Sequence, residues 1–77
     1  MSFHISLTSF EQIKSFVALA SRQSFAIRVG NDCQNINGKD FMGMFSLDYS
    51  EPLKVRMNCS EEEFMLFRSA VDQFVVK

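Results

Sequence analysis

Hydrophobic and polar residues alternate in four stretches of the chain, the pattern of a strand that buries one face. These stretches are residues 3–7, 25–29, 33–37 and 53–57. The third is weaker and more polar, and it follows Gly30-Asn31-Asp32, residue types of a tight turn. Residues 25–37 are therefore predicted to form a hairpin, and the other two stretches to be single strands.

A first helix is predicted to follow the first strand. Ser9 and Gln12, three residues apart, form a capping box at its start. Thr8 and Glu11 form a second, overlapping box, so two starts compete. The helix should end near Ser21, and one stripe of apolar side chains should face a core: Ile13, Phe16, Val17 and Ala20.

A second, short helix is predicted over residues 40–47, with Asp40 as its N-cap. Its large apolar residues are Phe41, Met42, Met44, Phe45 and Leu47. So short a helix cannot bury all five on one stripe, and some should remain at the surface.

The last helix is predicted to begin at Ser60, whose capping box carries acids at residues 61–63, where the helix dipole favours them. Apolar residues then recur at helical spacing to the C-terminus: Phe64, Phe67, Val71 and Phe74. The complete order is β-α-β-β-α-β-α in a single domain of residues 1–77. Such an α+β order packs one sheet against a layer of helices and leaves the other sheet face to solvent.

Composition limits the classes of function. A chain of 77 residues has room for one small domain, and 47% hydrophobic residues are too many for a disordered chain. The net charge of -1 provides no global field to attract nucleic acid or anionic lipid. Residues 1–10 lack Lys and Arg, so neither a signal peptide nor a membrane anchor is predicted. We expect a soluble cytoplasmic protein.

The two cysteines, Cys33 and Cys59, form no Cys-x-x-Cys pair and have no histidine cluster around them. Neither a metal site, a redox motif nor a cofactor is predicted. Both are expected to be free, buried thiols in a reducing compartment, with a single disulfide as the alternative.

One segment carries a family resemblance. Residues 39–47, Lys-Asp-Phe-Met-Gly-Met-Phe-Ser-Leu, resemble the second signature of the histidine-containing phosphocarrier (HPr) family, Lys-Ser-Ile-Met-Gly-x-Met-Ser-Leu. Asn37 also stands where the family has an Asn two residues before that Lys. The resemblance implies the family's open-faced β-sandwich, four antiparallel strands covered on one side by three helices. It also implies a relation to the bacterial phosphoenolpyruvate-dependent sugar phosphotransferase system.

The chain departs from the family at the phosphoryl carrier. The family carries a His at the start of its first helix, in a Gly-x-His-Ala-Arg-Pro-Ala motif. Ser9 stands at the His position and Glu11 at the Arg position. Histidine phosphotransfer needs an imidazole nucleophile, with an Arg and helix N-terminal N–H groups to hold the phosphate. A carboxylate there raises the energy of a phosphate dianion. We therefore predict no catalytic residue, no enzymatic activity and no phosphoryl transfer through His.

The family's second modification site is a regulatory Ser, which a kinase phosphorylates in many Gram-positive bacteria. Asp40 stands there in this chain. Its carboxylate either imitates the phosphorylated state with about half the charge or, more simply, acts only as an N-cap. His4, the only histidine, stands in the middle of a strand and is expected to be an exposed residue of the open sheet face.

HPr proteins dock enzymes and regulators around the starts of their first two helices. The matching positions are Phe10, Phe41, Met42 and Phe45. Methionine and aromatic residues suit an adaptable protein-binding patch. The alternative is that so small a chain needs these side chains for its own core, or buries them in a homodimer.

The family's strand order would place His4, Arg28, Lys54 and Arg56 together on the open sheet face. This patch is either a solvated face that discourages aggregation, which is the simpler interpretation, or an anion site.

The leading functional hypothesis is a regulatory or protein-binding module related to the phosphotransferase system, without nucleic-acid, membrane or metal partners. Two alternatives stay open. One is an active phosphocarrier with altered chemistry at Ser9 or His4. The other is a small oligomerising domain with no link to phosphotransfer.

Overall fold

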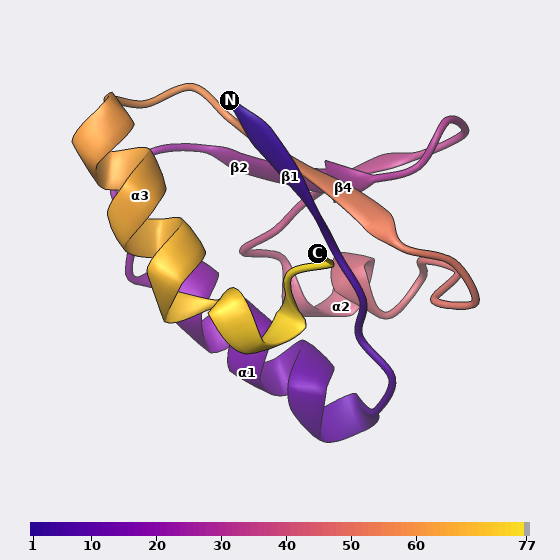
Figure 1. Ribbon diagram of the computed structural model, residues 1–77. Coiled ribbons are helices and arrows are strands. Elements are labelled where there is room, and N and C mark those ends of the chain that lie inside the picture. Colours follow the sequence, from indigo (N-terminus) through magenta and orange to yellow (C-terminus); the bar gives the residue numbers. More distant parts are fainter. Residues whose placement is uncertain (77) are drawn as a thin grey trace.

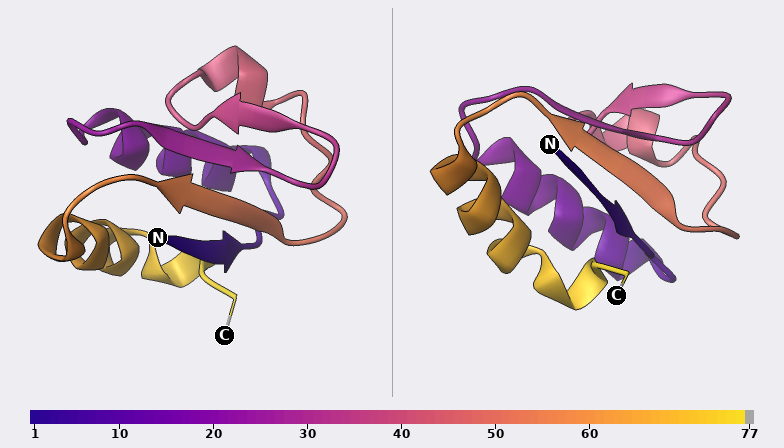
Figure 2. Two further views of the ribbon diagram at one scale, coloured as in Figure 1. Left: turned by 90° about the horizontal axis from the view of Figure 1, so that it is seen from above. Right: turned by 45° about the horizontal axis from the view of Figure 1, so that its top comes forward.

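Four strands form one antiparallel sheet in the order β1-β4-β2-β3 (Figure 1). The computed structural model describes residues 1–76. The strands are β1 (Ser2–Ile5), β2 (Ile27–Gly30), β3 (Asn35–Asn37) and β4 (Leu53–Met57). Three helices lie on one face of this sheet and leave the other open (Figure 2): α1 (Phe10–Ser21), α2 (Phe41–Met44) and α3 (Glu61–Ala70). The predicted α+β open-faced sandwich is confirmed.

The register of the strands separates an apolar face from a polar one. Val55 of β4 lies between Phe3 of β1 and Val29 of β2, and all three are buried under the helices. One residue further along β4, Arg56 lies opposite Arg28 on the open face. Because side chains alternate along a strand, every second residue of β4 faces solvent. The predicted gathering of basic residues on the open face is confirmed.

The helix starts follow the predicted caps. The Ser9 hydroxyl oxygen accepts a hydrogen bond from the Gln12 N–H (3.2 Å), so Ser9, and not Thr8, is the N-cap that sets the start of α1. At α3, the Ser60 hydroxyl oxygen accepts from the Glu63 N–H (3.1 Å), and the Glu63 carboxylate accepts from the Ser60 N–H (3.0 Å). These bonds satisfy amide groups that have no partner within the helix.

The core lies between the sheet and the helices, with Phe67 at its centre. Phe67 is fully buried, and its ring centroid lies 6.0 Å from that of Phe16 on α1 and 6.2 Å from that of Phe3 on β1. The predicted stripe of α1, from Ile13 to Ala20, is buried in the same core. This single cluster joins the sheet to α1 and α3.

The predicted strand over residues 33–37 is shorter than expected and begins only at Asn35. The reason is the side chain of Asn31, whose oxygen accepts hydrogen bonds from the N–H groups of Cys33 (2.8 Å) and Gln34 (2.9 Å). Those amides are used in the turn and do not enter the ladder with β2. The hairpin therefore has a longer loop and a shorter second strand than the sequence predicted.

The last helix also ends earlier than predicted, at Ala70, and continues as a 3₁₀ turn, η1 (Asp72–Phe74). The backbone then reaches the free edge of β1, where Val75 forms a bridge with Ile5 and the Val76 N–H donates to the His4 carbonyl (2.8 Å). The break in the helix lets Phe74 and Val75 be buried while their backbone pairs with the sheet.

The predicted second helix contracts to one turn. After Met44 the backbone bonds run to residues three back, from Phe45 N–H to Met42 and from Ser46 N–H to Gly43, so the segment tightens and ends. The expectation that both thiols are buried was wrong. Both cysteines are free, but Cys33 is exposed in the hairpin turn and Cys59 is half-buried.

Among residues 1–76, no helix is long and apolar enough to cross a membrane.

Candidate functional site

Three aromatic rings from the starts of α1 and α2 form one cluster. The centroids of Phe10 and Phe45 lie 4.8 Å apart with the rings stacked, and those of Phe41 and Phe45 lie 4.7 Å apart. Phe10 and Phe41 are separated by 6.4 Å. With the neighbouring Met42, these residues are called the aromatic patch below. The structure thus brings together residues that lie more than thirty positions apart in the sequence.

Most of the aromatic patch faces solvent. The exposed fraction is 56% for Phe10, 40% for Phe41 and 78% for Met42, whereas Phe45 is half-buried against the core. The alternative that the chain needs these residues for its core holds only for Phe45. Exposed apolar side chains that gather in one place are typical of an interaction surface.

Hydrogen bonds at both ends of α2 fix the patch. At the start, an Asp40 carboxylate oxygen accepts from the Gly43 N–H (3.1 Å), as predicted for an N-cap. The Lys39 ammonium group donates to the Gln23 carbonyl oxygen (2.6 Å), which ties α2 to the loop after α1. At the end, the Tyr49 hydroxyl donates to the Met44 carbonyl oxygen. The single turn of α2 is thereby held rigidly although it is too short to be stable alone.

Gly43 lets α2 lie close to the sheet. A Cβ added there would lie 2.7 Å from a methyl carbon of Ile36 on β3. A larger residue would push α2 outward and displace Phe41 and Phe45. The close packing of α2 on β3 therefore explains why residue 43 is a glycine in this chain.

Titration of Tyr49 reports on the contact at the end of α2. Burial raises the pKa of Tyr49 to about 12. Tyr49 is the only tyrosine and the chain lacks tryptophan, so phenolate absorbance near 295 nm belongs to this group alone. We expect a midpoint near pH 12 in the folded protein and near 10 in denaturant.

The sign of the associated stability effect follows from linkage. The folded state holds the phenol proton of Tyr49 more tightly than the unfolded state does. The contribution of Tyr49 to the free energy of unfolding is therefore complete below about pH 10 and is lost as the pH rises towards 12. A native midpoint near 10 would contradict the buried contact between Tyr49 and Met44.

Ser9 occupies the expected position at the start of α1, but its hydroxyl oxygen is already engaged in the N-cap hydrogen bond of the helix. It accepts the Gln12 N–H, and the Gln12 side-chain oxygen in turn accepts from the N–H of Thr8 (2.8 Å). Glu11 adds a carboxylate in the first turn. His4 faces the open side of the sheet, opposite the helices, and so supplies no base to Ser9. The two residues of the altered-phosphotransfer alternative are thus kept apart by the sheet.

A cationic rim beside the aromatic patch was not anticipated from the sequence. The Lys14 ammonium nitrogen lies 5.5 Å from the centroid of the Phe10 ring, within the range of a cation–π contact. Lys14, Lys39 and Phe41 line a shallow hollow of about 350 Å³ along α1. The spacing of Phe10 and Lys14, four residues apart on one helix, was the available signal for the first of these contacts.

Cys59 is not an activated nucleophile. Burial raises the pKa of the Cys59 thiol, and the Glu63 carboxylate raises it further, against a smaller opposing effect of the N-terminal ammonium group. Only the thiolate is a good nucleophile and metal ligand. Within residues 1–76 no three His, Cys, Asp or Glu side chains gather as a metal site would require.

Two solved structures of HPr proteins have the same fold as this chain. The crystal structure of HPr-C-His from Thermoanaerobacter tengcongensis matches with a TM-score of 0.73 and 24% sequence identity over 95% of this chain and 90% of that one. The phosphocarrier protein HPr from Bacillus anthracis matches with a TM-score of 0.70 and 22% identity over 91% and 94%. No protein-family model and no curated protein sequence matches the chain. The resemblance to HPr proteins is confirmed at the level of the fold.

Proposed function

We propose that this chain is a protein-binding regulatory module of the phosphotransferase system that acts without carrying phosphate on histidine and without catalysis. Its working surface is the aromatic patch. It acts in the cytoplasm, where the system's soluble components work.

The aromatic patch is the observation that carries this proposal. Phe10 and Phe41 are the first residues of their helices, so each projects from a rigid element and needs little ordering when a partner binds. Large aromatic side chains and methionine are the residues that dominate binding energy at the centres of interfaces. Lys14 and Lys39 lie at one margin, so the fitting partner presents an apolar surface with carboxylates beside it.

The start of α1 supports a role without phosphoryl transfer. An HPr-type carrier needs a nucleophilic nitrogen here and a cation to hold the phosphate. This chain presents the hydroxyl of Ser9, engaged as a cap, and the carboxylate of Glu11. The partner is therefore bound, on this proposal, without being phosphorylated.

Calorimetric titration with two purified proteins tests the proposal: the first enzyme of the phosphotransferase system and a regulator that HPr proteins bind. We expect at least one to bind. Replacing both Phe10 and Phe41 by Ser should weaken that binding by at least about 30-fold, the effect of losing one interface hot spot. Because both side chains are exposed, the variant should remain folded, as far-UV circular dichroism will show.

Met65→Ser is the matched control, because Met65 is also a large exposed apolar residue, at 61%, but lies on α3. It should bind as the parent chain does. Binding of neither protein, or equal losses in the two variants, would overturn the proposal. If sedimentation instead shows a dimer that the Phe10 and Phe41 substitutions dissociate, the patch is a self-association surface.

A further inference from the structure

The last helix presents two large apolar side chains to solvent. Met65 is 61% exposed and Leu66 is 65% exposed, whereas the next residue, Phe67, is fully buried. α3 packs on β1 at one edge of the sheet, where the ring centroids of Phe64 and Phe3 lie 5.7 Å apart, and α2 packs on β3 at the other edge (Figure 2). The outward face of α3 is therefore separate from the aromatic patch.

Exposure of Met65 and Leu66 removes two large apolar side chains from a small core. A domain of 77 residues buries a smaller share of its surface than a large domain does, so each large apolar residue stabilises it most when it is buried. A helix face that only had to be soluble would carry polar residues at both positions. Two such residues side by side on one face indicate a contact surface.

A shallow hollow of about 620 Å³ lies on this face of α3 and is lined by Glu61, Glu62, Met65, Leu66 and Ser69. Residues 62, 65, 66 and 69 stand at positions i, i+3, i+4 and i+7 of the helix. Four residues in this arrangement surround a side chain that is inserted from a facing helix. The occupant that fits the hollow is therefore a helix with a large apolar side chain.

Opposite charges lie at the two ends of the apolar pair. Glu62 stands three residues before Met65, and Arg68 stands three residues after it. The Arg68 side chain is 41% exposed and its guanidinium group lies 3.9 Å from the Asp72 carboxylate, so it keeps N–H donors for a second carboxylate. A second helix with the same order of charges, running antiparallel, would place its Arg beside Glu62 and its Glu beside Arg68.

We propose that two copies of this chain associate through α3, as an antiparallel helix pair related by a two-fold axis at Met65 and Leu66. Leu66 of each copy inserts into the hollow of the other, and Glu62 of each copy lies beside Arg68 of the other. Two-fold pairs are the commonest assemblies of identical chains, because one self-complementary surface supplies both halves of the contact.

The length of α3 sets the strength of this contact. The helix has 10 residues and is therefore about 15 Å long. A helix pair of that length buries less than the roughly 1,200 Å² at which stable interfaces begin. The dimer is therefore weak and dissociates on dilution.

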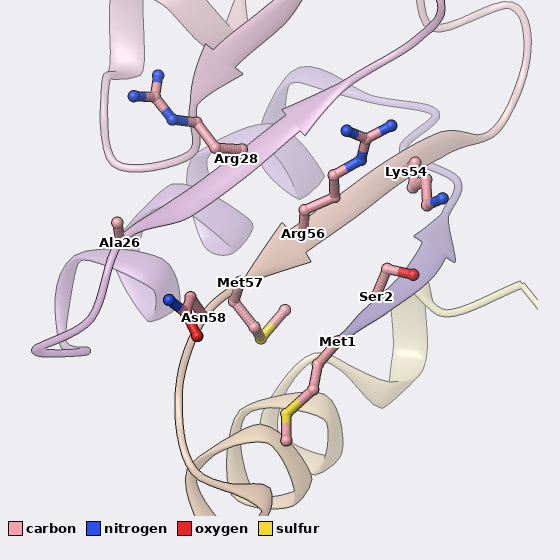
Figure 3. A pocket seen from close by; sticks show the side chains of 8 residues that line it. All are labelled: Met1, Ser2, Ala26, Arg28, Lys54, Arg56, Met57 and Asn58. Carbon is pink, nitrogen blue, oxygen red and sulfur yellow. The ribbon is translucent and has the colours of Figure 1, made fainter.

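The open face of the sheet is a poorer partner for α3. Figure 3 shows Arg28, Lys54 and Arg56 pointing in different directions, so they form no single cationic site. Asp32 and Glu51 line a hollow together with Lys54, and their carboxylates reduce the positive charge there. A contact between α3 of one copy and the sheet of another would also be head-to-tail, and it would form rings or open chains instead of a dimer.

Sedimentation equilibrium over a range of protein concentrations tests the proposal. We expect a monomer at micromolar concentration and a large fraction of dimer at about 1 mM. Leu66→Asp should weaken the dimer at least about 30-fold, because a two-fold contact loses the apolar side chain twice and gains two like charges close together. Since Leu66 is exposed, the variant should remain folded, as far-UV circular dichroism will show. The variant with both Phe10 and Phe41 replaced by Ser is the control and should dimerise as the parent chain does.

An exchange of charges tests the antiparallel two-fold arrangement. Glu62→Arg would bring two arginines together in each half of the contact, and Arg68→Glu would bring two glutamates together. Each variant alone should therefore dimerise at least about tenfold more weakly than the parent chain at low salt. An equimolar mixture of the two should dimerise within about threefold of the parent chain, because every such contact then joins one Arg to one Glu.

Several outcomes would overturn the proposal. It is wrong if the chain remains monomeric at about 1 mM, if Leu66→Asp dimerises as the parent chain does, or if the mixture dimerises no better than its two components. A dimer that the Phe10 and Phe41 replacements dissociate would also overturn it and would assign self-association to the aromatic patch.

Discussion

Phe67→Ala is expected to lower the free energy of unfolding by about 3–5 kcal/mol. Phe67 is fully buried and its ring packs against those of Phe3, Phe16 and Phe25, so truncation leaves a cavity where the sheet, α1 and α3 meet. A chain of 77 residues has a total stability of about 4–12 kcal/mol. Urea unfolding followed by circular dichroism should therefore show a clearly lower midpoint for the variant than for the parent chain.

Leu66→Ala is the matched control, one residue earlier on the same helix. Leu66 is 65% exposed, so its truncation should change the free energy of unfolding by no more than about 0.5 kcal/mol. If the two variants unfold at similar urea concentrations, Phe67 does not hold the layers together and the described core is wrong.

The second large effect concerns phosphoryl transfer. With the first enzyme of the phosphotransferase system and labelled phosphoenolpyruvate, this chain should take up at least about 10³-fold less acid-labile phosphate than an HPr protein, because the nucleophile is missing. Phosphohistidine is labile in acid and phosphoserine is stable, so the lability of any label identifies the residue type that carries it.

Replacing Ser9 by His and Glu11 by Arg in one variant should restore acid-labile labelling. The substitutions supply the nucleophile and the cation at a helix start that α1 already provides. Ser9→Ala and His4→Gln are the controls for label on the parent chain. Acid-labile label that His4→Gln removes, or acid-stable label that Ser9→Ala removes, would favour an altered phosphocarrier over the proposed binding module.

The fold alone does not decide between a carrier and a binding module. A phosphocarrier protein of Bacillus anthracis has the same fold, and in this chain α1 is capped by Ser9 and carries Glu11 in its first turn. Function depends on the residues placed on a fold rather than on the fold itself.

Features set by neighbouring residues were predictable from the sequence. The alternation in residues 53–57 identified β4, and the caps at Ser9, Asp40 and Ser60 identified the starts of all three helices. These signals are local, because period and capping depend on residues within one turn or one strand. The resemblance of residues 39–47 to the HPr signature supplied the strand order.

Other features depended on segments distant in the sequence. Which of the five apolar residues at 41–47 remain exposed was set by the packing of α2 on β3 and α1, which buried Met44 and left Phe41 and Met42 outside. The end of α3 was set by the free edge of β1, which pairs with Val75.

The sequence by itself therefore determined the elements, their order and the residue, Ser9, that caps the first helix. Only the tertiary structure decided that Phe10 stacks on Phe45 and that Lys14 and Lys39 border the aromatic patch. The physical reason is that exposure and charge pairing belong to surfaces, and a surface exists only when distant segments have packed together.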